Sequence, residues 1–252
     1  MTRRSRDRLR MALCMVPLLL LLAHAMGWLA VPAMARLDGR IYDMRLLSTM
    51  TSTLDERVVI VDVDEASLSR VGHWPWSRNR VADLLDELVV RQQAQAVGVD
   101  MVFAESDNSS GLSQLRSLAN DPATPAMGLE RWIESKAAEL DFDGQLVDAV
   151  RNRPVVLGYY FSSDGHNTRI GALPAPVFAR DAQANGQPVF RSNPPWTGYG
   201  SNIEPLTQAA TSAGFFNALT DPDGLVRTAP LLAEYEGAVY QSLALATFRQ
   251  AV

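Results

Sequence analysis

Acidic side chains follow two apolar stretches of the sequence. The first stretch is VVIV at 58–61, and the second is AVGV at 96–99. The six carboxylates after them are Asp62, Asp64, Glu65, Asp100, Glu105 and Asp107. Carboxylates that share one edge of a sheet repel one another unless a cation or a basic group neutralises them. The pattern therefore predicts a binding site for a small molecule or for a cation such as Ca²⁺ or Mg²⁺.

Trp74 and Arg78 complete the candidate ligand-binding residues. Trp74 opens the rigid Trp-Pro-Trp unit at 74–76, and its ring could stack on a ligand, although such rings more often seal a core. Arg78 follows Ser77, a predicted helix N-cap, so its cation lies in the first turn and opposes the helix dipole. We therefore expect Arg78 to have an acidic partner, either within the fold or in a ligand.

The same carboxylates have a structural interpretation. Asp is common at helix N-termini and in turns. Asp64 and Asp100 would then cap helices and pair with Arg78 or Arg80. The sequence leaves this interpretation and the binding site both open.

An enzymatic interpretation of the first acidic stretch lacks its companion motifs. Four apolar residues followed by Asp62-Val63-Asp64 resemble the strand motif of haloacid-dehalogenase-type phosphatases, in which the first Asp is a nucleophile and the second an acid/base, with Mg²⁺. Ala66 stands where Thr or Val is expected, and the only lysine, Lys136, lies in a polar predicted helix. No Walker A loop is present. We therefore assign no catalytic residue, no metal ligands and no cofactor, and the phosphatase is the least favoured alternative.

Charge and cysteine content exclude several functional classes. Residues 1–10 carry a net charge of +4, so with −5 overall the rest of the chain carries −9. An acidic body does not suit nucleic acid as a partner, because phosphates require a basic surface. The only cysteine, Cys14, lies in the apolar N-terminal stretch, and the three histidines are widely spaced. We therefore expect no disulfide and no zinc site in the folded part.

The N-terminus has the pattern of a membrane anchor. Residues 11–35 contain no Asp, Glu, Lys or Arg, and about 20 apolar residues suffice to span a bilayer. The arginines at 1–10 should stay in the cytoplasm, which places the chain after residue 35 outside. A cleaved signal peptide is the alternative, because Ala33-Met34-Ala35 resembles a cleavage site. We divide the chain into a cytoplasmic basic segment (1–10), a transmembrane anchor (11–35) and an extracytoplasmic domain (36–252).

Apolar periodicity predicts an α/β fold with a mixed sheet for the extracytoplasmic domain. Helices are expected at 36–50, 78–91, 129–152 with a break near 141–144, 206–212 and 238–252, and strands at 58–64, 96–103, 155–161, 214–219 and 225–235. The first two strands should be parallel neighbours in a βαβ unit. The last two should form an antiparallel hairpin around the turn at 220–224. The segment 162–202 has no periodicity and is expected to be a lid, a contact surface or a hairpin.

Several motifs, in this order along the chain, resemble those of one receptor family. They are Tyr42-Asp43-x-Arg45, VVIVDVDEASL at 58–68, GHWPWSR at 72–78, VGVDMVFAESD at 97–107, GFFN at 214–217, DPDGLVR at 221–227 and YQSLAL at 240–245. On these motifs the chain is similar to the type-two CHASE domain, an extracellular sensory domain of bacterial receptors. The similarity covers about residues 37–250, and 162–202 carries no motif of the family.

The resemblance implies the rest of the architecture. Such domains follow one N-terminal transmembrane helix, and further transmembrane helices and a cytoplasmic cyclase, diguanylate cyclase or kinase usually follow them. We therefore expect an inner-membrane receptor, longer than this chain and working as a homodimer, whose periplasmic or extracellular sensor binds an unknown small molecule or cation. The ligands of the family are largely undefined, so the resemblance assigns no site residue. The alternative is a membrane-anchored interaction or structural module, in which the acidic face and 162–202 bind a partner protein or a second copy.

Overall fold

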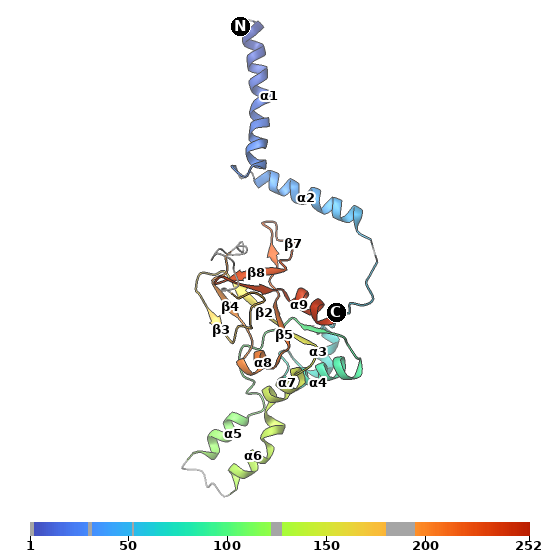
Figure 1. Cartoon of the computed structure of the whole chain (residues 1–252), viewed down its shortest axis with the longest axis vertical. Coiled ribbons are helices and arrows are strands. Elements are labelled where there is room, and N and C mark those ends of the chain that lie inside the picture. The colour runs from blue at the N-terminus through green and yellow to red at the C-terminus, as the bar shows by residue number, and fades with distance from the viewer. Residues whose placement is uncertain (1–2, 30–31, 52, 122–127, 180–194) are drawn as a thin grey trace. The chain divides into compact units, whose positions relative to one another are not determined.

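The chain divides into two units, Met1–Asp62 and Val63–Val252, which are described separately (Figure 1). The structure, a computed structural model, describes residues 3–29, 32–51, 53–121, 128–179 and 195–252. The first unit contains α1 (Arg3–Ala25) and α2 (Pro32–Thr49), and α2 confirms the helix predicted at 36–50. In the described part of the chain, no helix is both long and apolar enough to cross a membrane.

The centre of the second unit is β2 (Val155–Ser162), the longest strand of a five-stranded sheet. β1 (Val97–Val99) and β5 (Ser212–Phe215) both run parallel to β2 and pair with some of the same residues, so they occupy its two opposite edges. β4 (Gly198–Gly200) pairs antiparallel with the last residues of β2, and β3 (Arg169–Ile170) pairs with β4. The sheet is therefore mixed, as predicted, and β2 confirms the strand expected at 155–161.

Two antiparallel hairpins follow β5. β6 (Leu219–Thr220) pairs with β7 (Val226–Thr228), and β8 (Leu232–Tyr235) pairs with β9 (Ala238–Gln241). The turn predicted at 220–224 is present, but the strands that it joins are shorter than expected. Residues 238–241 are a strand, so the prediction that the last helix starts at 238 is wrong. All four residues of β9 pair with β8, and Val239, Tyr240 and Gln241 are buried. Pairing with a neighbouring strand and burial take precedence over the helical spacing.

The helices of the second unit confirm most of the helical periodicity. They are α3 (Glu65–Val71), α4 (Arg78–Asp86) with the π-helical turn η1 (Glu87–Arg91), α5 (Leu112–Ala119), α6 (Leu129–Leu140), α7 (Phe142–Val150), α8 (Glu204–Ala209) and α9 (Leu243–Ala251). The helix predicted at 78–91 is thus confirmed, with a π-helical last turn. The break predicted near 141–144 is confirmed too, because Asp141 ends α6 and caps α7 by accepting the Gly144 N–H at 2.9 Å.

The two halves of β2 pack into different parts of the core. Val155 and Leu157 lie in an aliphatic cluster with α4, α7 and α8. Tyr159 and Phe161 lie in an aromatic cluster with side chains of β5, β8 and β9. These four side chains share one face because side chains alternate along a strand. None is more than 2% exposed, and burial of each contributes roughly 1.5–3 kcal/mol.

The strand predicted at 58–64 is wrong. These residues form no helix or strand, and the four side chains at 58–61 are between 53% and 88% exposed. A run of β-forming residues becomes a strand only where a neighbour takes up its backbone hydrogen bonds and packs its side chains. The parallel neighbour of β1 is β2, so the βαβ unit predicted between 58–64 and 96–103 is also wrong.

Candidate functional site

Asp107, rather than Ser77, caps the N-terminus of α4. Ser77 occupies the N-cap position, but its hydroxyl donates to Asn79 Oδ1 at 2.5 Å and makes no capping bond. Asp107 Oδ2 accepts the backbone N–H of Arg78 at 2.7 Å, and Oδ1 accepts the backbone N–H of Ser109 at 2.8 Å. A carboxylate is favoured here because free N–H groups and the positive end of the helix dipole meet it. Ser77 is therefore the N-cap residue, as predicted, but its expected side-chain hydrogen bond is wrong, because a loop residue from later in the chain supplies that bond.

The side chain of Arg78 is held by groups of the fold itself. Its guanidinium carbon lies 4.5 Å from the centre of the Phe103 ring, and Nη2 donates to the backbone oxygen of Glu105 at 3.0 Å. Its Nε lies 3.7 Å from Asp143 Oδ1, an ion pair without a hydrogen bond. Asp143 Oδ2 in turn accepts the backbone N–H of Asp107 at 2.9 Å. The expectation that Arg78 has an acidic partner is therefore confirmed.

We call Arg78, Asp107 and Asp143 the α4 cap cluster. The side chains of Arg78 and Asp143 are only 16% and 19% exposed. The cluster ties the loop after β1 to the beginnings of α4 and α7, which agrees with the structural interpretation of the sequence. Sequence reasoning missed Asp143, although it lies inside the helix break predicted near 141–144. Ligand binding by Arg78 and Asp107 stays a prediction.

Asp107→Ala is expected to lower the free energy of unfolding by about 1–2 kcal/mol near neutral pH, because the cap of α4 is lost. Burial alone would raise the pKa of Asp107, but hydrogen bonds from Ser109 and from the Arg78 N–H, with the charge of Arg78, hold that pKa below its ordinary value of 3.8. The stabilisation is therefore present in full above pH 3.8 and is lost as the pH falls through the folded-state pKa. Urea unfolding of both proteins at neutral and acidic pH measures this difference.

The matched control for this variant is Asp148→Ala on α7. The Asp148 side chain is 81% exposed and pairs with Arg151 at 3.8 Å. Its removal should change the free energy of unfolding by less than about 0.5 kcal/mol. A cost for Asp107→Ala that is the same at every pH would contradict a charged cap.

Asp64 is a helix cap, as the structural interpretation predicted, but it does not pair with Arg78 or Arg80. Its Oδ1 accepts the backbone N–H of Ser67 at 2.8 Å and the Ser67 hydroxyl at 2.6 Å, and these bonds lower its pKa. The same interpretation is wrong for Asp100, because the next helix of the described chain, α5, begins only at Leu112.

Asp62 is exposed and ends the first unit. Neither Asp62 nor Asp64 lies at the end of a strand, the position that the phosphatase motif requires. The geometry therefore does not support that alternative.

The remaining predicted site residues do not join the α4 cap cluster through their side chains. Four have exposed side chains: Glu65, Trp74, Asp100 and Glu105. The Trp74 ring meets Trp76 edge to face at 5.8 Å, and Trp76 Nε1–H donates to the Gly72 oxygen at 2.9 Å. Among the described residues, no group of three or more His, Cys, Asp or Glu side chains could hold a metal ion. The structure thus gathers Arg78, Asp107 and the backbone of Glu105, and leaves the other predicted residues separate.

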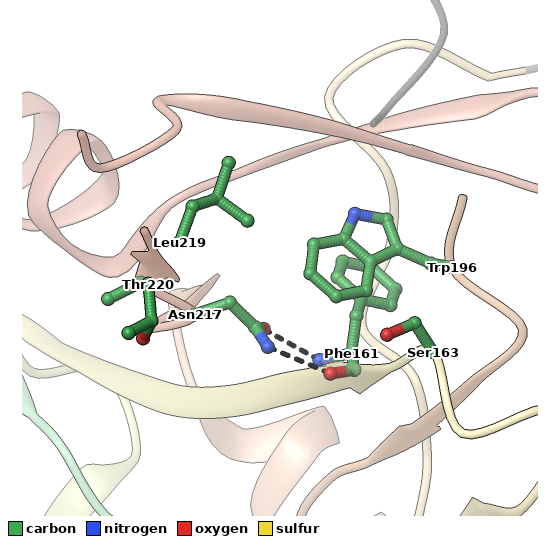
Figure 2. Close-up of a pocket in the computed structure, with 7 residues that line it drawn as sticks. Phe161, Ser163, Trp196, Asn217, Leu219 and Thr220 are labelled. Atoms are coloured by element: carbon green, nitrogen blue, oxygen red, sulfur yellow. Dashed lines mark hydrogen bonds between the residues drawn. The ribbon is translucent and has the colours of Figure 1, made fainter. Parts of the chain in front are cut away.

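A cavity of about 520 Å³ opens at the carboxyl ends of β2 and β5. Phe216 follows β5 and still donates its N–H to the Tyr159 oxygen at 3.0 Å. At the next residue, the Asn217 side chain replaces the backbone: Oδ1 accepts the Phe161 N–H at 2.7 Å, and Nδ2 donates to the Phe161 oxygen at 2.8 Å (Figure 2). The Asn217 side chain thus continues the hydrogen bonding between β5 and β2 for one more residue, while its backbone turns away from β2. The cavity lies where the two backbones separate.

Trp196 and Ser163 lie on one side of the cavity, and Leu219 and Thr220 lie on the other (Figure 2). The Trp196 ring stacks on Phe161, with centroids 5.9 Å apart and planes inclined by 26°. In α/β sheets, ligands bind outside the carboxyl ends of the strands. Sequence reasoning applied this rule to 58–64 and 96–103, whereas the geometry satisfies it at β2 and β5. The GFFN motif at 214–217, which ends in Asn217, was the available signal.

A model of the CHASE2 domain family matches residues 15–252 of the chain. The chain belongs to this family. CHASE2 domains are extracellular sensory domains of signalling receptors and are not catalytic, so the resemblance seen in the sequence is confirmed. No curated protein and no solved structure matches the chain.

Proposed function

We propose that this CHASE2 domain is the extracytoplasmic sensory input of a bacterial transmembrane receptor. The observation that carries the proposal is the family match over residues 15–252. The use of Asp64 as a helix cap, rather than as a carboxylate at a strand end, removes the geometry that the phosphatase alternative needs.

The proposed membrane arrangement rests on the N-terminal sequence. Residues 11–35 form the anchor, and the arginines at 1–10 keep the N-terminus in the cytoplasm. The domain after residue 35 then faces the periplasm or the exterior, where an external ligand reaches it. The arrangement places the sensor and its output on opposite sides of the inner membrane.

The proposed mechanism is a ligand-biased conformational equilibrium in a homodimer. A ligand shifts such an equilibrium only if it binds two states with different affinity. The conformational change would reach the membrane through the segments 36–50 and 238–252. Across the membrane it would alter the activity of a cytoplasmic cyclase, diguanylate cyclase or kinase. The ligand would be a small molecule or a cation, and nucleic acid is not a partner.

A reporter fusion tests the proposed orientation. Alkaline phosphatase joined after Val252 is expected to be active, because this enzyme folds only outside the cytoplasm, and the same reporter joined after Arg10 should be inactive. Replacing the five arginines at 1–10 by asparagine should reduce the activity of the first fusion several-fold, since these charges set the orientation. An inactive fusion after Val252 alongside an active cytoplasmic reporter at that position would overturn the proposal.

A chimaera tests the sensory role itself. The chain is joined through a second membrane span to an adenylate cyclase domain in cells that lack their own cyclase. The proposal expects cyclic AMP to change when the composition of the external medium changes. Output that is constant over media that differ in carbon source, salts and divalent cations would contradict a sensory role.

A further inference from the structure

The described residues that line the cavity at the end of β2 carry no charged side chain. Its polar groups are two hydroxyls and one carboxamide, from Ser163, Thr220 and Asn217. In the β6–β7 hairpin, Arg227 pairs with both Asp221 at 2.6 Å and Asp223 at 2.7 Å. These three side chains carry a net charge of −1 and are not among the residues that line the cavity. An ionised ligand group would find no opposite charge on this lining, and burying it there would cost free energy. The cavity therefore suits a neutral ligand.

The polar groups of the cavity can both donate and accept hydrogen bonds. No hydrogen bond to another protein group involves the side chain of Ser163 or Thr220 within the part of the chain that the structure describes. Asn217 uses one side-chain N–H and one Oδ1 lone pair in its hydrogen bonds with Phe161. Its carboxamide therefore retains a second N–H and a second lone pair. Such groups match ligand hydroxyls, which also donate and accept.

Trp196 supplies a flat apolar surface beside these polar groups. It is partly exposed, and Phe161, which is 2% exposed, stacks against it and fixes the plane of the indole. The face of an aromatic ring carries partial negative charge. The C–H groups on one face of a sugar ring carry partial positive charge, so such a ring is attracted to the indole while its hydroxyls point outward.

The geometry points to a binding site for a neutral mono- or disaccharide in this cavity, with the sugar ring on Trp196 and its hydroxyls on Ser163, Thr220 and Asn217. The volume of about 520 Å³ lies within the ~300–1,000 Å³ of small-molecule sites. The position at the carboxyl ends of parallel strands is the usual one for ligands in such sheets. This assignment deepens the proposed sensory function, and it rests on that function for its biological meaning.

The test is a titration of the whole chain with defined sugars. The protein is kept in a detergent without a sugar headgroup, and the five tryptophan indole N–H signals are followed by NMR. The probes are glucose, galactose, cellobiose and lactose, with glucuronate as the charged counterpart and benzamide as a flat neutral ring without hydroxyls. We expect a saturable shift of the Trp196 signal with at least one neutral sugar, at millimolar affinity.

Matched tryptophan variants make the titration specific. Trp196→Ala should weaken sugar binding about tenfold, the loss expected for one stacking contact. Trp132→Ala, which removes a 52% exposed ring on α6, should leave binding unchanged. Ser163→Ala and Thr220→Ala remove only exposed hydroxyls. They should each weaken binding several-fold without unfolding the domain, so they keep the test valid if Trp196→Ala fails to fold.

Several results would overturn the assignment. Binding of glucuronate as tight as that of glucose would refute a neutral site, and a Trp196 shift with benzamide alone would identify a site for flat aromatic molecules. A titration with no Trp196 shift, or with equal shifts of Trp132, would refute a sugar site. The cyclase chimaera separates the two proposals. If Ser163→Ala changes its output while no sugar binds, the sensory function stands and the ligand class is wrong.

Discussion

Asn202→Leu is expected to lower the free energy of unfolding by about 2–6 kcal/mol, because it leaves two buried backbone groups without partners at roughly 1–3 kcal/mol each. Asn202 is 1% exposed. Its Oδ1 accepts the Phe103 N–H at 2.8 Å, and its Nδ2 donates to the Gly158 oxygen at 2.9 Å. The side chain thus joins the segment after β1 to the middle of β2. Leucine has a similar shape but neither polar atom.

A loss of this size is a large part of the ~5–15 kcal/mol that stabilises a typical domain. Urea unfolding followed by circular dichroism measures it. Asn120→Leu is the matched control: Asn120 is exposed and caps α5 with its backbone N–H alone, so its cost should stay below about 0.5 kcal/mol. Equal stability of Asn202→Leu and the wild type would show that Phe103 and Gly158 find other partners.

Phe161→Ala is expected to cost about 3–5 kcal/mol, the range for removing a buried Phe side chain. Phe161 is the hub of the aromatic cluster. Five rings have centroids between 5.3 and 5.9 Å from its own: Tyr159, Trp196, Phe215, Tyr235 and Tyr240. Removing this ring leaves a cavity that surrounding rigid rings fill poorly, and it removes the support of Trp196. Thermal or urea unfolding measures the cost.

Two further variants bracket this result. Phe161→Leu keeps part of the volume and should cost less than the alanine variant. Phe248→Ala removes a 63% exposed ring from α9, and its effect should stay below about 0.5 kcal/mol. If Phe161→Ala and Phe248→Ala were equally mild, the aromatic cluster would not be the core that the packing indicates.

Elements with a strong local signal were predicted from the sequence. β2 consists of apolar and aromatic residues, interrupted by Gly158, between a proline and a polar loop. α4 has one apolar stripe and ends in η1. The break between α6 and α7 follows from Asp141 and Gly144, whose capping bond is local. In each case neighbouring residues in the sequence make the interaction that defines the element.

Features that depend on distant residues were not predictable in this way. Asp107 caps a helix that begins 29 residues earlier, and Asn202 binds Phe103 across 99 residues. The cavity depends on Trp196 and Asn217 meeting at β2, and a single sequence contains no signal for that meeting. The sequence did identify Arg78 as a cation in need of an acidic partner, because the helix dipole argument is local.

The segment 180–194, part of the unassigned 162–202 stretch, lies outside the described residues.

The exposed run at 58–61 has a consequence for how the protein behaves in concentrated solution. Three valines and an isoleucine, uncharged and largely open to solvent, are the type of segment from which cross-β aggregation starts. Arg57 precedes the run and Asp62 follows it, and charges in these flanking positions oppose the stacking of identical chains. Ionic strength screens such repulsion. The colloidal stability of the chain should therefore depend on salt more strongly than its folding does.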